Sequence, residues 1–175
     1  TKSGERILHT RKVPVKNTVG ESIYLLGISE DITDQKNLEK NLRESEERFR
    51  HLFEKSPDAM FIVEIESSRI SQCNLAAAAL FRGRLDQIVG KLPSDLSPDT
   101  QPSGESSAET LGNMIKNTLK HGRYRCEYIK KKFDGEIFWA DLHTSIVQVQ
   151  SKQTILMAVR DISKMKLLEE DLRRS

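Results

Sequence analysis

The first pattern along the chain is typical of β-strands. Residues 22–32 are rich in β-favouring and apolar side chains, among them Ile23, Tyr24 and Leu25. The preceding segment 17–20 ends in Gly20 and has the composition of a turn. We therefore predict an antiparallel hairpin whose strands are residues 5–15 and 22–32.

The pattern then changes to a helical period. Leu38, Leu42, Ser45, Phe49 and Leu52 recur at alternating intervals of four and three residues, which is the heptad spacing of a helix that pairs with another helix. Ser45 is a polar interruption of this seam. We predict a helix over residues 33–55 that pairs with its copy in a parallel homodimer. The predicted dimer seam consists of Leu38, Leu42, Phe49 and Leu52. An alternative is that Leu52 and Phe53 pack back onto their own domain and the helix is a spacer.

The remaining pattern predicts an α+β domain with an antiparallel sheet. Strand-like and helical segments follow one another in the order strand, strand, short helices, longer helix and three strands. One face of such a sheet is expected to be covered by the small helices. The predicted strands are 59–65, 69–73, 123–132, 136–148 and 153–162; the predicted helices are 75–81, 85–89 and 108–121, with a loop at 93–107.

An internal repeat gives the domain organisation. The segment from Ile28 to Leu38 recurs, 130 positions later, from Ala158 to Leu168. A period of this size is a whole domain. We therefore predict the terminal hairpin of one copy at 1–32, a connector helix at 33–55, a complete copy at 56–163 and the start of a second connector helix at 164–175.

Several short motifs in this order resemble the PAS superfamily of sensor proteins. They are the helix-to-strand segment from Ser45 to Ala59, the Asn74-x-Ala-Ala-x-x-x-Phe81 helix, the Ser97-Pro-x-x-Gln-Pro-x-Gly104 loop, the Phe133-Asp-Gly-Glu136 hairpin, and the Asp31-Ile-Thr33 and Asp161-Ile-Ser163 endings. The resemblance implies a PAS-like five-stranded antiparallel sheet with short helices on one face. It also implies a small apolar cavity.

The resemblance further indicates which residues surround that cavity. They are apolar residues of the first strand, the helices and the inner sheet face: Phe61, Val63, Ala77, Leu80, Phe81, Ile115, Leu119, Phe138 and Leu142. The same residues are equally expected of an ordinary close-packed core.

The two Asp-Ile-Thr/Ser endings stand where a strand passes into a helix. We expect the hydroxyls of Thr33 and Ser163 to cap the helices that follow. Asp31 and Asp161 are expected to favour the positive helix end or to pair with a cation. In the functional interpretation, these four residues relay strain from the sheet to the helix; plain capping is the alternative.

Charge and hydropathy exclude some partners. The chain has 28 basic and 26 acidic residues, a net charge of +2, which gives no basis for nucleic-acid binding. No apolar run approaches the roughly 20 residues that span a bilayer. We expect a cytoplasmic module, within a parent protein that can carry its own membrane anchor.

No metal or cofactor site is predicted. None of the four histidines stands at ligand spacing from another His, Cys or acid. His121 closes the long helix, where haem-binding relatives of the family carry an axial ligand, so haem stays open as an alternative. The reactive cysteine motif of flavin-binding members is absent, and Cys73 and Cys126 do not form a C-x-x-C pair.

Two further features concern the last strands. The run Lys130, Lys131 and Lys132 is interpreted as an exposed strand edge kept soluble by lysines. Alternation places Phe138 inward and Trp139 on the outer sheet face, where we expect it to pack against the connector helix or a second subunit.

The leading function is a non-catalytic sensory and dimerisation module of a signal-transduction protein, with an unidentified small molecule as a possible ligand. The alternatives are a ligand-free structural interaction module and a haem-dependent gas or redox sensor. No Gly-flanked nucleophile or output motif occurs, so no enzymatic activity is expected of these residues. A fused output domain, such as a histidine kinase, is expected in the parent protein.

Overall fold

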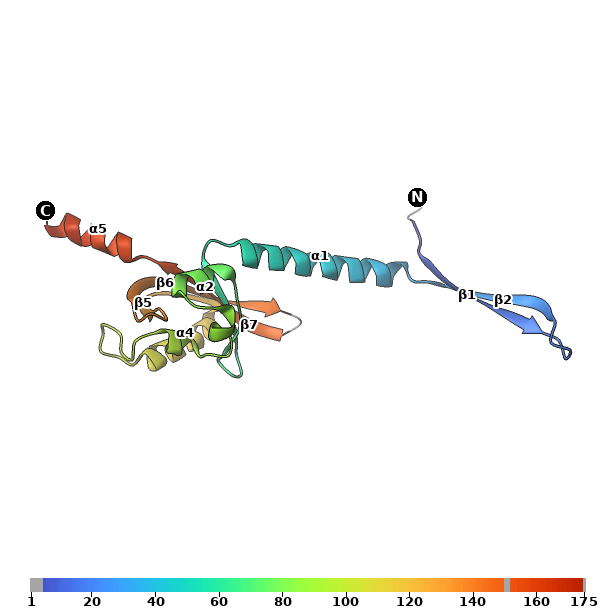
Figure 1. Cartoon of the computed structure of the whole chain (residues 1–175), viewed down its shortest axis with the longest axis horizontal. Coiled ribbons are helices and arrows are strands. Elements are labelled where there is room, and N and C mark those ends of the chain that lie inside the picture. The colour runs from blue at the N-terminus through green and yellow to red at the C-terminus, as the bar shows by residue number, and fades with distance from the viewer. Residues whose placement is uncertain (1–4, 150–151, 175) are drawn as a thin grey trace. The chain divides into compact units, whose positions relative to one another are not determined.

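The computed structural model describes residues 5–149 and 152–174 (Figure 1). The chain divides into two compact units, Thr1–His51 and Leu52–Ser175. Each unit is described by itself. In the described residues, none of the helices combines the length and apolar character needed to cross a bilayer.

The first unit contains the predicted hairpin. Strands β1 (Leu8–Lys16) and β2 (Ser22–Asp31) pair antiparallel. The side-chain oxygen of Asn17 accepts hydrogen bonds from the backbone of Val19 and Glu21, and Gly20 closes the turn with φ of 88°. Every residue of β1 and β2 is exposed, on both faces of the hairpin.

Helix α1 (Thr33–Lys55) follows directly, with the predicted bounds. Its off-seam charges form pairs one turn apart, such as Arg43 with Glu47 at 2.9 Å. Such exposed pairs contribute little to stability, because water screens the charges.

The second unit is built on an antiparallel sheet. In its described residues the sheet has five strands in the order β4-β3-β7-β6-β5, so the first and last strands of this unit, β3 and β7, lie side by side. This confirms the predicted fold class. The strands are β3 (Ala59–Glu64), β4 (Ile70–Cys73), β5 (Arg123–Lys131), β6 (Ile137–Val149) and β7 (Lys152–Asp161).

Short helices cover one face of this sheet (Figure 1). They are α2 (Leu75–Phe81), α3 (Leu85–Ile88), the 3-10 helix η1 (Pro93–Leu96) and α4 (Ser107–His121), and a last helix, α5 (Ser163–Arg174), continues from β7. The 3-10 turn lies in a segment predicted as loop. Pro93 at its first position and the Asp95 carboxylate, which accepts from the Leu92 N–H at 2.9 Å, explain why it forms.

The core lies between these helices and the sheet. Phe81 of α2 is in edge contact with Phe61 of β3 and with Phe138 of β6, with ring centroids 5.7 and 5.6 Å apart. All three rings are buried. Edge-to-face aromatic pairs of this kind add about 1 kcal/mol each beyond the buried area.

Candidate functional site

The strand-to-helix junction at Asp161 is held by a compact set of hydrogen bonds. The Asp161 carboxylate accepts from the Ser163 N–H at 2.9 Å. The Ser163 hydroxyl accepts from the Trp139 N–H at 3.0 Å, and the Ile162 N–H donates to the Trp139 carbonyl at 2.8 Å. The first turn of α5 is therefore fixed to β6 as well as to β7.

The junction at Asp31 repeats this arrangement. The Asp31 carboxylate accepts from the N–H of Thr33 at 3.1 Å and from its hydroxyl at 2.5 Å. The Thr33 oxygen accepts from the Ile7 N–H at 2.8 Å, and the Ile32 N–H donates to the Ile7 carbonyl at 2.9 Å. Ile7 thus occupies the place that Trp139 has at the other junction.

The junction differs from the prediction in one respect. The hydroxyls of Thr33 and Ser163 do not cap the following helix but accept from the neighbouring strand. The carboxylates take the capping role, and the hydrogen bonds from Thr33 hold the pKa of Asp31 below its ordinary value. The carboxylates and not the hydroxyls cap the helices because Thr33 and Ser163 are themselves the first helical residues, and their side chains point back toward the sheet.

Asn74 joins the end of α1 to the sheet within the second unit. Its side-chain oxygen accepts from the N–H of Met60 and of Ala77, each at 3.0 Å. Its amide donates to the carbonyls of Phe53 at 2.9 Å and of Asp58 at 3.0 Å. The predicted helix cap is present, and the same side chain fixes the entry of the chain into β3.

Most of the residues predicted for the cavity are in the core. Phe61, Val63, Ala77, Phe81, Phe138 and Leu142 are buried, and Leu80 and Ile115 are half-buried against the same cluster. Leu119 does not belong there, since it is 41% exposed. Thr118 takes the inward position on α4 instead, because its hydroxyl bonds to Thr144 on β6 at 2.6 Å.

The interior space is small. A pocket with about 170 Å³ between its atoms lies under η1, without room for a water molecule. Of the residues predicted for the cavity, Phe61 and Phe81 line it. Its other walls are Ile70, Pro93, Leu96, Lys130, Met157 and Val159. As it stands, this interior is a packed core with one charged residue in its wall.

That charged residue corrects the interpretation of the lysine run. Lys130 is 1% exposed and Lys132 8%, so neither is part of a solvated edge. Alternation along β5 places Tyr128 and Lys130 on the inner face, and β5 is covered there by η1. The Nζ of Lys130 donates to the Pro93 carbonyl at 2.8 Å and lies 5.2 Å from the Tyr128 ring centroid.

The sequence alone did not reveal this because three adjacent lysines are usually solvated. Burial lowers the pKa of Lys130 to about 7. The available signal was the alternation with Tyr128, which assigns Lys130 and not Lys131 to the core-facing side.

A second residue that sequence reasoning missed is Gln101. Its amide donates to the Ser107 hydroxyl at 2.7 Å and to the Ile129 carbonyl at 3.1 Å, and its oxygen accepts from the Ile129 N–H at 2.7 Å. The side chain therefore pairs with the edge strand β5 as another backbone would. It holds the segment 93–106 over the interior.

The predicted dimer seam lies on α1. Leu38, Leu42 and Leu52 are exposed, whereas Phe49 is half-buried. The alternative was that Leu52 and Phe53 pack onto their own domain. Phe53 is buried in the second unit and agrees with it, whereas Leu52 is exposed and does not. The pairing of two copies remains a prediction.

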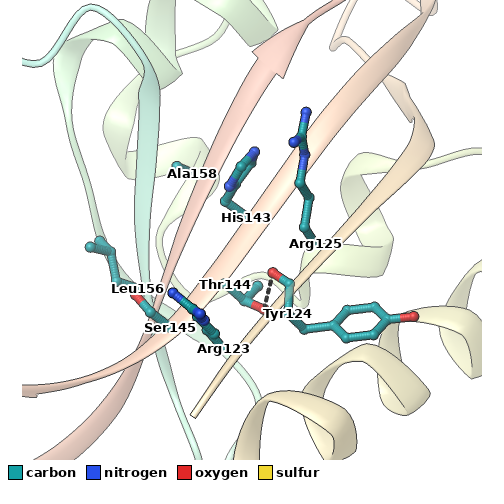
Figure 2. Close-up of a pocket in the computed structure, with 8 residues that line it drawn as sticks. All are labelled: Arg123, Tyr124, Arg125, His143, Thr144, Ser145, Leu156 and Ala158. Carbon is teal, nitrogen blue, oxygen red and sulfur yellow. Dashed lines mark hydrogen bonds between the residues drawn. The ribbon is translucent and has the colours of Figure 1, made fainter. Parts of the chain in front are cut away.

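The outer face of the sheet carries an open groove of about 560 Å³ (Figure 2). Figure 2 shows the residues of β5, β6 and β7 that line it: Arg123, Tyr124, Arg125, His143, Thr144, Ser145, Leu156 and Ala158. The Thr144 side chain points to the opposite face of the sheet, where its hydroxyl bonds to Thr118. Its charge is partly neutralised. Arg125 donates twice to Asp141 at 2.9 Å, which lowers the pKa of that carboxyl, and His143 contacts the same carboxylate at 3.1 Å.

Trp139 lies on this outer face, as predicted. The Nζ of Lys166 from α5 lies 5.3 Å from its ring centroid and also pairs with Glu127 of β5. The side chain that contacts the Trp139 ring therefore comes from α5, whereas we had expected the connector helix α1 or a second subunit to cover it.

Other candidate chemistry finds no site in the described residues. No cluster of three or more His, Cys, Asp or Glu that suits a metal occurs among them. Cys73 and Cys126 are free thiols, and burial raises the pKa of each to about 11. His121 is exposed at the end of α4, outside the interior where a haem would have to lie.

Comparison with known proteins agrees with this geometry. The family model described as "PAS fold" matches residues 47–162, about two thirds of the chain. A curated relative, sporulation kinase E of Bacillus subtilis, is 27% identical over 157 residues, which are 87% of this chain and 19% of that protein. The chain therefore spans about a fifth of the length of this relative.

Solved structures share the fold at lower identity. The PAS domain of an HTR-like protein from Haloarcula marismortui has a TM-score of 0.54 at 20% identity, covering 73% of this chain and 99% of that one. A PAS domain of a LuxR-family transcriptional regulator from Burkholderia thailandensis, solved in complex with ethanol, has a TM-score of 0.53 at 24% identity, covering 66% and 97%.

Proposed function

The chain belongs to the PAS family, and we propose that it is a non-catalytic sensory and dimerisation module whose sheet controls the helices at its two ends. PAS domains are the sensory modules of signal-transduction proteins, histidine kinases among them. The finer parts of the proposal are the relay through the junctions, a ligand in the interior and pairing through α1.

The duplicated junction is the observation that carries the proposal. At Asp31 and at Asp161 the carboxylate accepts from the N–H of the first helical residue, and the hydroxyl of that residue accepts from a strand N–H. The first helical turn is thereby attached to two strands. A shift of one strand against the other must therefore change the direction in which the helix leaves. A signal of this kind needs only two states within a few kcal/mol of each other.

The relay is tested by removing the carboxylate at the outgoing junction. Asp161→Ala leaves the Ser163 N–H without its acceptor, so we expect faster amide hydrogen exchange at Lys166 and at Trp139 and unchanged exchange in β3. Glu170→Ala on α5 is the matched control, because among the described residues its side chain pairs with Arg174 alone, at 3.9 Å. Equal exchange in the two variants contradicts the relay.

Pairing through α1 is the second part of the proposal. Leu38 and Leu42 lie exposed on one stripe of a helix, as suits a narrow seam against another helix. The double variant Leu38→Asp, Leu42→Asp is expected to be monomeric by light scattering, with the circular dichroism of the second unit retained. If this variant remains a dimer, the two copies associate through another surface, such as the groove of Figure 2.

A ligand-free interaction module is the second candidate function. It is supported by the interior pocket, which has no room for a water molecule as the side chains stand. The ethanol complex of the Burkholderia thailandensis domain supports the first candidate, since a small molecule is bound to a protein of the same fold. Native mass spectrometry of gently purified protein distinguishes a retained ligand from an empty interior.

The activity of the whole protein is a further proposal. The relative from Bacillus subtilis is named as a kinase, and this chain corresponds to a fifth of it. We infer a parent protein in which these residues regulate a fused output domain such as a histidine kinase. A haem-dependent sensor, the third alternative, predicts coloured protein with a Soret absorption band.

A further inference from the structure

Lys130 is a buried amine without an anionic partner. In residues 5–149 and 152–174, its Nζ makes one hydrogen bond, to the Pro93 carbonyl, and no ion pair. An ammonium carries three N–H donors, and a buried charge that lacks a carboxylate is unfavourable. The interior therefore contains a donor that a bound anion would satisfy better than the present carbonyl does.

The charged form of Lys130 is accessible near neutral pH, because burial lowers its pKa to about 7 and not further. Its titratable neighbours do not compete for an anion. Burial keeps Cys126 a neutral thiol, with its pKa raised to about 11, and also raises the pKa of Tyr128. Asp95 on η1 is exposed and accepts from the Leu92 N–H.

The pocket beside Lys130 selects by size and polarity. Apart from the amine and the Pro93 carbonyl, its walls are the apolar side chains of residues such as Phe61, Phe81 and Leu96. A phosphate or a dicarboxylate needs several donors, and a single amine in an apolar wall suits one negative charge with an apolar tail. As the side chains stand, the pocket has no room for a water molecule, so a ligand must be short and can enter only if η1 moves away from Lys130.

A ligand that reaches the pocket has to displace the segment 93–106, which covers it. This segment is attached to β5 by side-chain contacts: Lys130 to Pro93, Gln101 to Ile129, and the Tyr128 hydroxyl to the Ser107 carbonyl at 2.7 Å. The contact of Lys130 is the one that a ligand must replace. Movement of η1 away from the amine enlarges the pocket and exposes the donor together.

We propose that Lys130 anchors a short-chain monocarboxylate, whose carboxylate accepts from Nζ in place of the Pro93 carbonyl while its tail lies against the apolar pocket walls, Phe81 and Leu96 among them. The inference rests on the proposed sensory function, since it assigns a chemical class to the ligand of that pocket. Binding would displace η1 from β5 and so connect the ligand to the sheet.

The test compares butyrate with butyramide, a neutral molecule of the same size, by isothermal titration calorimetry on the full chain. We expect butyrate to bind more tightly at pH 6.5 by about tenfold, the effect of one charge-assisted hydrogen bond. The preference should shrink at pH 8.5, where Lys130 is largely neutral. This comparison within the wild-type protein needs no substitution.

Two variants and one control complete the experiment. Lys130→Met and Lys130→Gln remove the charge, the second while keeping a donor near Pro93, and each is expected to bind both compounds equally. Lys131→Met, on the opposite face of β5, should retain the preference. Equal binding of butyrate and butyramide to the wild-type protein overturns the lysine anchor but leaves a ligand-binding interior intact.

Absence of binding by either compound also overturns the inference. The relay and the dimer seam would be unaffected, because their tests by hydrogen exchange and light scattering do not depend on these ligands.

Discussion

The hairpin β1–β2 and the hairpin β6–β7 have the same junction to a helix but opposite environments. In each hairpin the aspartate that ends the second strand lies opposite a residue of the first strand, Asp31 opposite Leu8 and Asp161 opposite Ala140. Each of these opposite residues directly follows the residue that bonds to the junction, Ile7 or Trp139. Yet Leu25 in β2 is 64% exposed, whereas Ile155, 130 positions later in β7, is 1% exposed.

The difference shows which part of the fold is local. The junction forms without a core behind it, since the carboxylate accepts from the N–H two residues on and the hydroxyl accepts from the paired strand in both hairpins. Burial depends on β3, β5 and the helices, which in the described residues accompany only the second hairpin. An isolated hairpin is at most marginally stable in water.

The largest effect is expected from truncating the two corresponding strand residues. Ile155→Ala removes a core side chain and should lower the free energy of unfolding by about 2–5 kcal/mol. Leu25→Ala, its counterpart at the exposed hairpin, should change that free energy by less than about 0.5 kcal/mol. Urea unfolding followed by circular dichroism measures both. A large cost for Leu25→Ala would mean that a further surface covers β2.

Two asparagines sharpen the same contrast. Asn74→Ala removes the side-chain hydrogen bonds to the Met60 and Ala77 N–H groups and to the Phe53 carbonyl, in a buried site. We expect a loss of about 2–3 kcal/mol, because unsatisfied buried groups bear the full cost of desolvation. Asn17→Ala removes similar bonds at the exposed turn, where water replaces them, and should cost under about 1 kcal/mol.

Thermal unfolding of the two asparagine variants, monitored at the same protein concentration, makes the comparison. Equal losses would show that hydrogen bonding and not burial distinguishes the two units.

The smallest effect is a dependence on pH. Because burial lowers the pKa of Lys130 to about 7, the unfolded chain keeps a proton that the folded chain releases as the pH rises above 7. Stability should therefore increase with pH from about 7 to 8.5, by at most about 1.4 kcal/mol per pH unit for one proton. Above about pH 9 the raised thiol pKa values of Cys73 and Cys126 act in the opposite direction.

Lys130→Met should abolish this rise, and the half-buried Lys131→Met should keep it. Urea midpoints at pH 6.5, 7.5 and 8.5 provide the measurement. A rise of the same slope in Lys130→Met would assign the titration to another group.

The chain itself determined the order and type of its elements. Apolar alternation located the strands of the sheet, the heptad spacing predicted helix α1, and the repeat of Asp31-Ile-Thr33 at Asp161 identified two equivalent junctions. These signals are readable because they arise from neighbours in sequence, and local hydrogen bonds and side-chain periodicity act over a few residues.

Only the tertiary structure decided which side chains face the interior. Lys130 is buried because η1, some 37 positions earlier, lies across β5, and Leu119 is exposed because Thr118 bonds to Thr144 on β6. The hydroxyls of the junctions turn to strand backbones that belong to a different part of the sequence. Such contacts join residues far apart along the chain, and the pattern of neighbouring residues does not show which distant residues meet after folding.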